Sequence, residues 1–279
     1  EVQHHYAHAS SLMAENNLDE VVCLALDGAG YGLDGQIWGG EIICAKNGVM
    51  KRAASLEPHP MPGGDLAAVY PARMLAGILH SHYSEEELKS VLTRHTGDAF
   101  RNGELDLVLK QLRSGFNTPL TSSTGRVLDA AASLLGVCRE RTYEGEPAMK
   151  LEALAARGTP ELNFPIIFSE TEGRHILETG AMLKQAVDLL ESSSRKEDIA
   201  ASIQQGIARG LSKLALRCAR EKDIKAIGVS GGVAYNHSIV SEIGCYVREK
   251  GFEFYTQTKA PPGDGGISLG QVWHTVLSR

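Results

Sequence analysis

The chain has 279 residues, of which 43% are hydrophobic and 22% are charged, and its formal net charge is -6. This composition is typical of a globular protein with one large domain or two modest ones. The acidic balance, without a basic block, argues against nucleic acid as a partner. No apolar run approaches the roughly 20 residues that span a bilayer, so no membrane partner is expected either. The five cysteines are scattered, which indicates buried thiols in a reducing compartment, and we expect a cytoplasmic protein.

The start of the chain predicts one helix followed by an antiparallel β-meander. We expect the helix over residues 4–16 and the three strands over residues 21–26, 36–45 and 49–54. Apolar residues three and four apart predict the helix, and a short continuous apolar run predicts that the first strand is buried. A glycine-rich turn over residues 27–32 joins the first two strands. Asn47-Gly48 is a strong signal for a two-residue hairpin between the next two.

The middle of the chain is mostly helical, and the end returns to alternating strands and helices. Helical periodicity predicts helices over residues 66–81, 84–95, 124–137, 146–157, 177–192 and 196–220. Residues 164–169 can form a strand, which Pro165 would confine to an edge or a strand start. Strands over residues 224–229 and 252–256 each precede a helix. The order predicts an α/β domain with a mixed sheet and a large helical insertion, about residues 66–220.

The segment His4-His5-Tyr6-Ala7-His8 places two histidines at positions i and i+4. Residues so spaced share one helix face, with Cβ atoms about 5–6 Å apart, and two imidazoles there can hold one metal ion. The zinc-protease motif H-E-x-x-H uses this geometry, but His5 stands where that motif has its general base, so the protease hypothesis fails. The alternative is a polar or capped helix face without a metal.

Two further segments can approach an anion or a metal. In Asp27-Gly28-Ala29-Gly30-Tyr31-Gly32 the backbone N–H groups can cradle a phosphate and the aspartate can reach a metal, although a plain hairpin is the alternative. Thr121-Ser122-Ser123-Thr124-Gly125-Arg126 precedes the predicted helix that carries Asp129. Its hydroxyl groups are typical helix caps, and Arg126 can hold an anion or lie on a solvated face.

The last third of the chain contains two glycine-rich loops. Residues 230–236 join a buried strand to a helix, where Gly231 and Gly232 permit close approach of a ligand to the helix N-terminus. Asn236 follows, and it can bond the ligand or face solvent. In residues 261–271 three glycines surround Asp264 at a helix start, so this carboxylate is either an N-cap or a metal ligand.

These segments occur together in an order that resembles the C-terminal carbamoyl-transfer domain of the HypF family of NiFe-hydrogenase maturation proteins. The resemblance runs from Val2 to Gln271. Besides the two C-terminal loops, it is carried by Val2-Gln3-His4-His5-Tyr6-Ala7-His8, Leu26-Asp27-Gly28-Ala29-Gly30-Tyr31-Gly32, Trp38-Gly39-Gly40-Glu41, Pro62-Gly63-Gly64-Asp65, Thr121-Ser122-Ser123-Thr124-Gly125-Arg126 and Thr142-Tyr143-Glu144-Gly145.

The resemblance implies an actin/hexokinase-like ATPase fold that binds an adenylate, made from ATP, and one iron or zinc ion. The implied metal ligands are His4, His8, Asp27 and Asp264. The candidate nucleotide-binding residues are Gly28, Gly125, Arg126, Asp129, Gly231, Gly232 and Asn236. The implied reaction moves a carbamoyl group from carbamoyl-adenylate to the C-terminal cysteine of the partner HypE, releasing AMP. No residue resembles a covalent nucleophile, which fits an attacking thiol on the partner, and no catalytic residue is assigned.

Relatives in this family carry an adenylate-forming domain upstream in the same polypeptide. We therefore expect residues 1–279 to be an N-terminally truncated domain fragment, namely the second lobe with its helical insertion and with the first lobe largely absent. Such a fragment is expected to bind ligands weakly, transfer slowly and self-associate. The alternatives are a tRNA threonylcarbamoyl transferase, a small-molecule O-carbamoyltransferase, and a nucleotide-binding fragment without activity. The acidic charge and the segments 27–32 and 38–41 stand against the tRNA enzyme.

Overall fold

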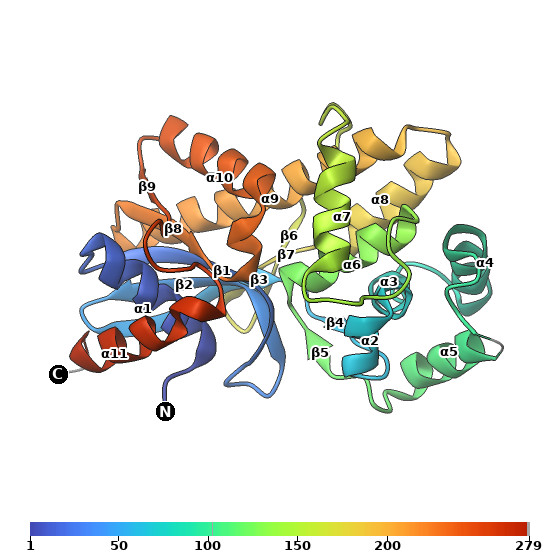
Figure 1. The fold of residues 1–279 in the computed structure, drawn as a ribbon, viewed down its shortest axis with the longest axis horizontal. Coiled ribbons are helices and arrows are strands. Elements are labelled where there is room, and N and C mark those ends of the chain that lie inside the picture. Colours follow the sequence, from blue (N-terminus) through green and yellow to red (C-terminus); the bar gives the residue numbers. More distant parts are fainter. Residues whose placement is uncertain (102, 278–279) are drawn as a thin grey trace.

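A computed structural model describes residues 1–101 and 103–277, and its centre is a mixed sheet with helices on both faces (Figure 1). In these residues the sheet has nine strands in the order β6-β7-β3-β2-β1-β8-β9, and β4 and β5 pair with each other beside β2. The strands are β1 (Val21–Tyr31), β2 (Ile37–Lys46), β3 (Val49–Leu56), β4 (His59–Pro60), β5 (Leu120–Thr121), β6 (Phe168–Thr171), β7 (Arg174–Leu177), β8 (Ala226–Ser230) and β9 (Glu253–Tyr255).

The helices at the two ends of the chain cover one face of the sheet. The other helices cover the opposite face or form a larger block beside the sheet (Figure 1). The helices are α1 (His4–Asn16), α2 (Asp65–Val69), α3 (Pro71–Leu79), α4 (Glu85–Thr96), α5 (Glu104–Ser114), α6 (Thr124–Leu134), α7 (Glu146–Ala155), α8 (Gly180–Glu191), α9 (Lys196–Lys222), α10 (His237–Glu249) and α11 (Ile267–Leu277), with short 3-10 helices η1 (Gly232–Tyr235) and η2 (Asp264–Gly266). Within the described residues, no helix combines the length and the apolar character needed to cross a membrane.

Strand β1 is buried on both faces, which explains its continuous apolar run. Leu24 and Leu26 pack into the large core shared with α6 and α9, whereas Cys23 and Ala25 pack on the other face against α1. Strand β2 pairs with β1 in antiparallel fashion and β8 pairs with it in parallel fashion. Asp27, the residue that follows Leu26, therefore lies on a central strand of the sheet.

The glycine-rich segment after Leu26 is not a turn, and this prediction was wrong. Strand β1 continues to Tyr31 with an irregular register between Leu26 and Gly30, and the chain reverses only at residues 32–36. Glycine is tolerated at such an irregularity, where another backbone or ligand approaches closely. A Cβ on Gly30 would lie 2.6 Å from His5 Cε1. The glycine thus lets the strand pass directly beneath α1.

Most other predicted elements are confirmed. Asn47 and Gly48 have φ values of 52° and 74°, as the two-residue hairpin requires. The helices predicted from residue 84 onward correspond to α4, α6, α7, α8 and α9, and the last two strands are β8 and β9. The helix predicted over residues 66–81 is two helices, because Tyr70 is extended before Pro71. The strand predicted over residues 164–169 begins only at Phe168, where it pairs with β7.

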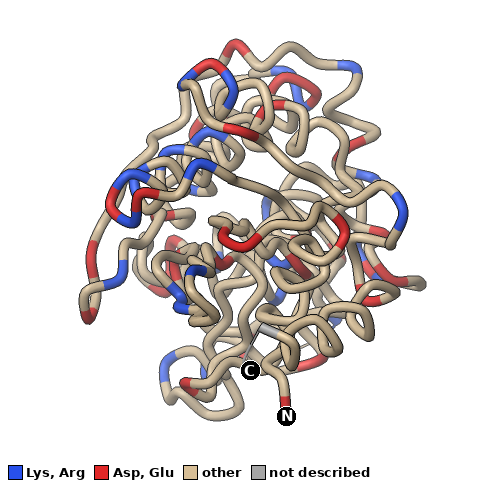
Figure 2. The backbone as a smooth tube through the Cα atoms, turned by 90° about the vertical axis from the view of Figure 1, so that its left-hand side faces the viewer, with Lys and Arg blue, Asp and Glu red and all other residues tan. Residues whose placement is uncertain are grey.

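Charged residues are spread over the backbone trace. Figure 2 shows segments with Lys or Arg interspersed with segments that carry Asp or Glu. This distribution agrees with a net charge of -6 that arises from mixed signs.

Candidate metal and nucleotide site

Helix α1 carries the two histidines of the predicted pair. The Gln3 side chain caps the helix by accepting a hydrogen bond of 2.9 Å from the Tyr6 backbone N–H. His4 and His8 then lie one turn apart on the same face. The His8 side chain is fully buried and 26% of the His4 side chain is exposed. The helix therefore presents a buried imidazole and a partly exposed one to Asp27 on β1.

The structure brings the four predicted metal ligands together. One ligand atom from each of His4, His8, Asp27 and Asp264 lies within 4.8 Å of the others. His4 Nε2 is 3.0 Å from Asp27 Oδ2 and 3.5 Å from Asp264 Oδ1, and His8 Nε2 is 3.5 Å and 3.7 Å from the same atoms. Metal–ligand bonds of about 2.0–2.2 Å would place neighbouring corners of a tetrahedron roughly 3.4 Å apart. These separations fit one first-row metal ion.

The surroundings of the cluster are those of a cation site. Burial alone would raise the pKa of Asp27, but the hydrogen bond from His4 and the nearby His8 ring outweigh it and hold this pKa well below its ordinary value. The Gly232 N–H donates to Asp27 Oδ1 at 3.0 Å, which fixes the carboxylate. Neither ring nitrogen of the buried His8 has a hydrogen-bond partner among the described residues. A metal ion would satisfy one of these nitrogens.

His5, between the two ligands, has a different environment. Its side chain is buried, and Gln3 Nε2 lies 3.2 Å from its Nδ1. Burial and the neighbouring His4 lower the pKa of His5 to about 3, so this imidazole is neutral. Its Nε2 has no partner in residues 1–101 and 103–277. In the sequence, His5 excluded a protease and belonged to the segment 2–8 that carries the family resemblance, and the structure adds that it is not part of the ligand cluster.

The candidate nucleotide glycines lie around the irregularity of β1 that follows Leu26. A Cβ on Gly231 would be 2.2 Å from the Leu26 carbonyl oxygen, and a Cβ on Gly125 would be 2.9 Å from Gly28 Cα. Gly231 has a φ of 103°, a region that L side chains rarely adopt. Nothing lies within 4 Å of a Cβ placed on Gly28. These segments form a backbone-lined rim beside the cluster of His4, His8, Asp27 and Asp264, and such a rim suits a phosphate.

Helix α6 places Arg126 and Asp129 in the interior. Their side chains are 6% and 1% exposed, and Arg126 Nη2 lies 2.6 Å from Asp129 Oδ2. Burial raises the pKa of Asp129 despite the nearby guanidinium groups of Arg126 and Arg141. Within the described residues, Arg126 Nε and Asp129 Oδ1 have no hydrogen-bond partner. These unsatisfied polar atoms are consistent with a ligand contact, which remains a prediction.

Asn236 is engaged within the protein. Its side-chain oxygen accepts from the Ile239 N–H at 2.9 Å and caps α10, and its amide nitrogen donates to Gln204 Oε1 at 2.9 Å. The residue is 7% exposed. Of the two possibilities drawn from the sequence, facing solvent is excluded. A contact with nucleotide stays a prediction and would have to coexist with the cap.

A buried hydrogen-bond network, which was not predicted from the sequence, holds the backbone of Asp27 and Gly28 in place. Glu41, on β2, accepts hydrogen bonds from its own glycine-rich strand and from Arg52 and Ser122. The next residue, Ser123, has its hydroxyl within hydrogen-bond distance of the Asp27 and Gly28 carbonyl oxygens, at 2.9 and 2.6 Å. The network thereby ties the start of α6 to the ligand-bearing strand. The glutamate after two glycines in the segment 38–41 was its sequence signal.

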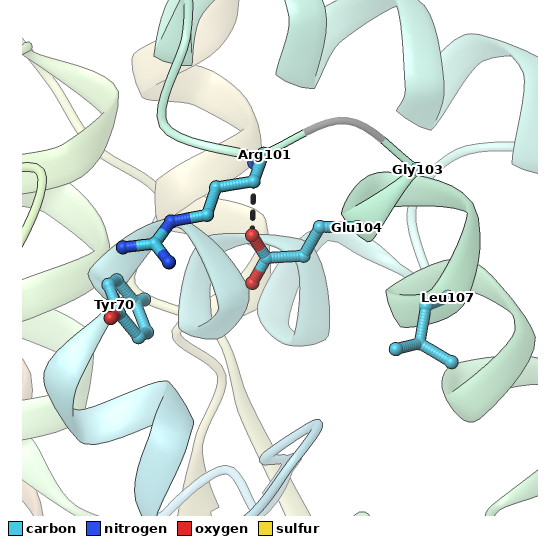
Figure 3. A pocket seen from close by; sticks show the side chains of 5 residues that line it. All are labelled: Tyr70, Arg101, Gly103, Glu104 and Leu107. Atoms are coloured by element: carbon cyan, nitrogen blue, oxygen red, sulfur yellow. Dashed lines mark hydrogen bonds between the residues drawn. The ribbon is translucent and has the colours of Figure 1, made fainter.

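A pocket in the helical block is separate from this site. Figure 3 shows that it is lined by Tyr70, Arg101, Gly103, Glu104 and Leu107. The Arg101 N–H donates to Glu104 Oε2 at 3.0 Å, and the same carboxylate pairs with the Arg73 guanidinium at 2.6 Å. Glu104 therefore holds the start of α5 against α3. The candidate site residues do not line this pocket.

Comparisons with known proteins agree with the geometry. The family model for "Carbamoyltransferase, Kae1-like Domain, second subdomain" matches residues 23–271. A probable carbamoyltransferase HypF of Methanocaldococcus jannaschii is 42% identical over 271 residues, which are 97% of this chain and 34% of the relative. The crystal structure of T. kodakarensis HypF has a TM-score of 0.91 at 43% identity and covers 99% of this chain and 36% of that one. A full-length HypF in the phosphate- and nucleotide-bound form has a TM-score of 0.88 at 34% identity, over 98% of this chain and 42% of that one.

The matched second subdomain of a Kae1-like domain and the mixed α/β sheet confirm the predicted fold class. The chain spans about a third of the length of the Methanocaldococcus jannaschii relative and of the carbamoyltransferase HypF2 of Cupriavidus necator. The similarity extends over nearly the whole of this chain, and the family model includes Asp27 and Asp264. The chain therefore belongs to the HypF family of carbamoyltransferases, where it corresponds to the second subdomain of the Kae1-like domain.

Proposed function

We propose that this chain supplies the carbamoyl-transfer site of a HypF-type carbamoyltransferase. In this proposal the carbamoyl group moves from carbamoyl-adenylate to the C-terminal cysteine of HypE during maturation of NiFe hydrogenase. The observation that carries the proposal is the convergence of two imidazoles and two carboxylates beside glycine-rich segments, at the irregularity of β1 that follows Leu26. The names of the relatives support the carbamoyl group, and the nucleotide-bound relative supports the adenylate.

The four ligands suit one iron or zinc ion, which when bound would polarise the carbamoyl carbonyl as a Lewis acid. The chain itself shapes that role. His8 and Asp27 form the buried wall of the cluster, with side chains 0% and 11% exposed, whereas 72% of the Asp264 side chain is exposed. Substrate would therefore approach from the side of Asp264, and the backbone N–H groups of the glycine loops would face the phosphate.

The transfer needs no covalent intermediate on this chain. The partner's thiolate would attack the carbamoyl carbon, a C–S bond would form, and the C–O bond to the adenylate phosphate would break. The electron pair would leave on AMP, and the thiol proton would pass to solvent before attack. We propose that the adenylate is made by another domain of the same polypeptide, as the resemblance implies.

The metal site is tested by elemental analysis. The purified chain should hold about one metal ion, and the double variant His4→Ala/His8→Ala should lose it. His95→Ala is the matched control, because His95 lies on α4 and contacts Glu191 at 3.5 Å, away from the cluster. Unchanged metal content in the double variant would rule out this site.

Transfer is tested with synthetic carbamoyl-adenylate and HypE, followed by mass spectrometry of the HypE C-terminal peptide. The proposal expects a thiocarbamate adduct that depends on His4 and His8. Nucleotide binding by calorimetry without any adduct would instead favour the alternative of a nucleotide-binding chain without activity. An adduct of equal yield with the double variant would refute the role of the metal cluster.

A further inference from the structure

One face of α1 contacts both the metal cluster and the loop that supplies its last ligand. His4, His8, Ser11 and Glu15 follow at i, i+4, i+7 and i+11, so their side chains lie along one stripe of the helix. The first two belong to the cluster. The other two contact the loop of residues 257–263, which leads from β9 into η2 and Asp264. Figure 1 shows α11, which follows this loop, lying alongside α1.

Glu15 is wrapped by the backbone of that loop. Its Oε1 accepts hydrogen bonds from the N–H groups of Thr258 and Lys259 at 2.6 and 2.9 Å, and its Oε2 accepts from the Ala260 N–H at 2.8 Å. The Thr258 hydroxyl adds a fourth bond at 3.0 Å. Burial opposes ionisation of Glu15, but these bonds outweigh it and lower its pKa. Three successive donors aimed at one carboxylate fix the path of the loop.

Gln257 fixes the same loop from the inside. This residue is 9% exposed, and its Nε2 donates to Ser11 Oγ at 2.9 Å. Its Oε1 accepts from Ser230 Oγ at 2.6 Å, at the end of β8. The Gly231 N–H donates to the Pro262 carbonyl oxygen at 2.7 Å. The loop is thus bound to α1 on one side and to the glycine loop after β8 on the other.

We infer that Glu15 and Gln257 are positioning residues that aim Asp264 at the two imidazoles, an inference that rests on the metal site proposed above. The Asp264 side chain is 72% exposed, and no hydrogen bond holds its carboxylate among the residues that the structure describes. Its place 3.5 Å from His4 Nε2 is therefore set by the loop backbone. Because loss of a group that orients a metal ligand typically lowers metal affinity roughly 10–100-fold, we expect a released loop to weaken metal binding.

The test compares metal binding by Glu15→Gln and Gln257→Leu with that of the unaltered chain. Gln at position 15 keeps one acceptor oxygen but turns an NH2 group toward the Ala260 N–H. Glu20→Gln is the matched control, because Glu20 contacts Lys46 Nζ at 3.0 Å and lies outside the loop. We expect Zn²⁺ affinity, measured by competition with a chromophoric chelator, to fall at least about tenfold in both loop variants and to stay unchanged in the control. The Co²⁺ absorption spectrum should also change, which a general loss of stability would not produce.

A double-mutant cycle with Asp264→Ala decides whether the effect passes through the ligand. In the Asp264→Ala background, Glu15→Gln should cause no further loss of Zn²⁺ affinity. Additive losses would mean that Glu15 acts elsewhere, and unchanged affinity and spectrum in Glu15→Gln would overturn the inference while the metal site stands. If the unaltered chain binds no metal that depends on His4 and His8, the proposed site fails and the inference fails with it.

Discussion

Replacing Asn236 by alanine separates a structural role from a ligand contact. The side chain caps α10 through Ile239 N–H and donates to Gln204 Oε1, both at 2.9 Å. Loss of an N-cap costs about 1 kcal/mol. Leaving Gln204 Oε1 unpaired in the interior costs about 1–2 kcal/mol more. We therefore expect Asn236→Ala to lower the free energy of unfolding by about 2–3 kcal/mol.

The assay is urea denaturation followed by circular dichroism, with AMP calorimetry on the folded protein. With a slope of about 2–3 kcal/mol per molar urea, the midpoint should fall by about 1 M. The urea midpoint of Asn236→Ser should lie between those of the unaltered chain and Asn236→Ala, because a serine hydroxyl restores the cap but does not reach Gln204. If Asn236→Ala unfolds at the same urea concentration as the unaltered chain, the capping argument is wrong. If AMP affinity does not fall several-fold in the folded variant, the predicted nucleotide contact is wrong instead.

Three further substitutions follow from packing and burial. Burial and nearby His82 lower the pKa of His59 to about 3, so stability is full above pH 6.5 and should fall as the unfolded chain takes up a proton below it. At pH 5 the free energy of unfolding should be lower by about 2 kcal/mol, minus the stabilisation that the Glu57 carboxylate, 3.5 Å away, gives to the protonated imidazole. His59→Gln should flatten this dependence of stability on pH in urea titrations. Gly270→Ala places a Cβ 1.8 Å from a carbonyl oxygen of α1 and should lower the melting temperature markedly. Gly28→Ala has open space for its Cβ, so it should leave the melting temperature unchanged but weaken AMP binding in calorimetry.

Local patterns in the sequence accounted for most of the elements that build the site. The helix that carries His4 and His8 has the predicted bounds, because its periodicity and its asparagine end are local signals. The strand after it was predicted too short. Glycines 28, 30 and 32 read as a turn, but pairing of Gly30 with Trp38 on β2 holds the chain extended. Pairing between the two strands thus overrode the turn propensity of the glycines.

Two misses in the helical block have different causes. Helix α5 has apolar residues at Leu105, Val108, Leu109 and Leu112, with glycines just outside both ends, so its signal was present in the sequence. The β6–β7 hairpin was predicted only in part, as the strand over residues 164–169. It turns through Glu172 at a φ of 53°, and its strands are set by pairing of β7 with β3. A strand whose partner lies over 100 residues away cannot be located from local spacing.

The contacts that position the site could not be predicted from local patterns either, because their partners are far apart in the sequence. Glu15 and Ala260 are 245 residues apart in the chain, and the contact between them leaves no periodic trace. The density of glycine around Asp264, by contrast, has a packing reason that the structure supplies. A Cβ on Gly266 would lie 2.3 Å from the Pro261 carbonyl oxygen. Small residues are therefore required where α11 starts against α1, whether or not a metal is bound.

The unequal burial of the two carboxylates predicts that they contribute unequally to metal binding. Asp27 is 11% exposed and is fixed by the Gly232 N–H, whereas Asp264 is 72% exposed and faces solvent. Water screens the attraction between a metal ion and a buried carboxylate much less than the attraction to an exposed one. Removing the buried charge therefore costs more binding free energy. Matched substitutions Asp27→Asn and Asp264→Asn preserve shape and remove one charge each. Chelator competition should show that Asp27→Asn weakens Zn²⁺ binding at least about tenfold more than Asp264→Asn does. Equal losses would mean that the cluster is solvated alike on both sides, and that the open approach through Asp264 is not the route to the metal.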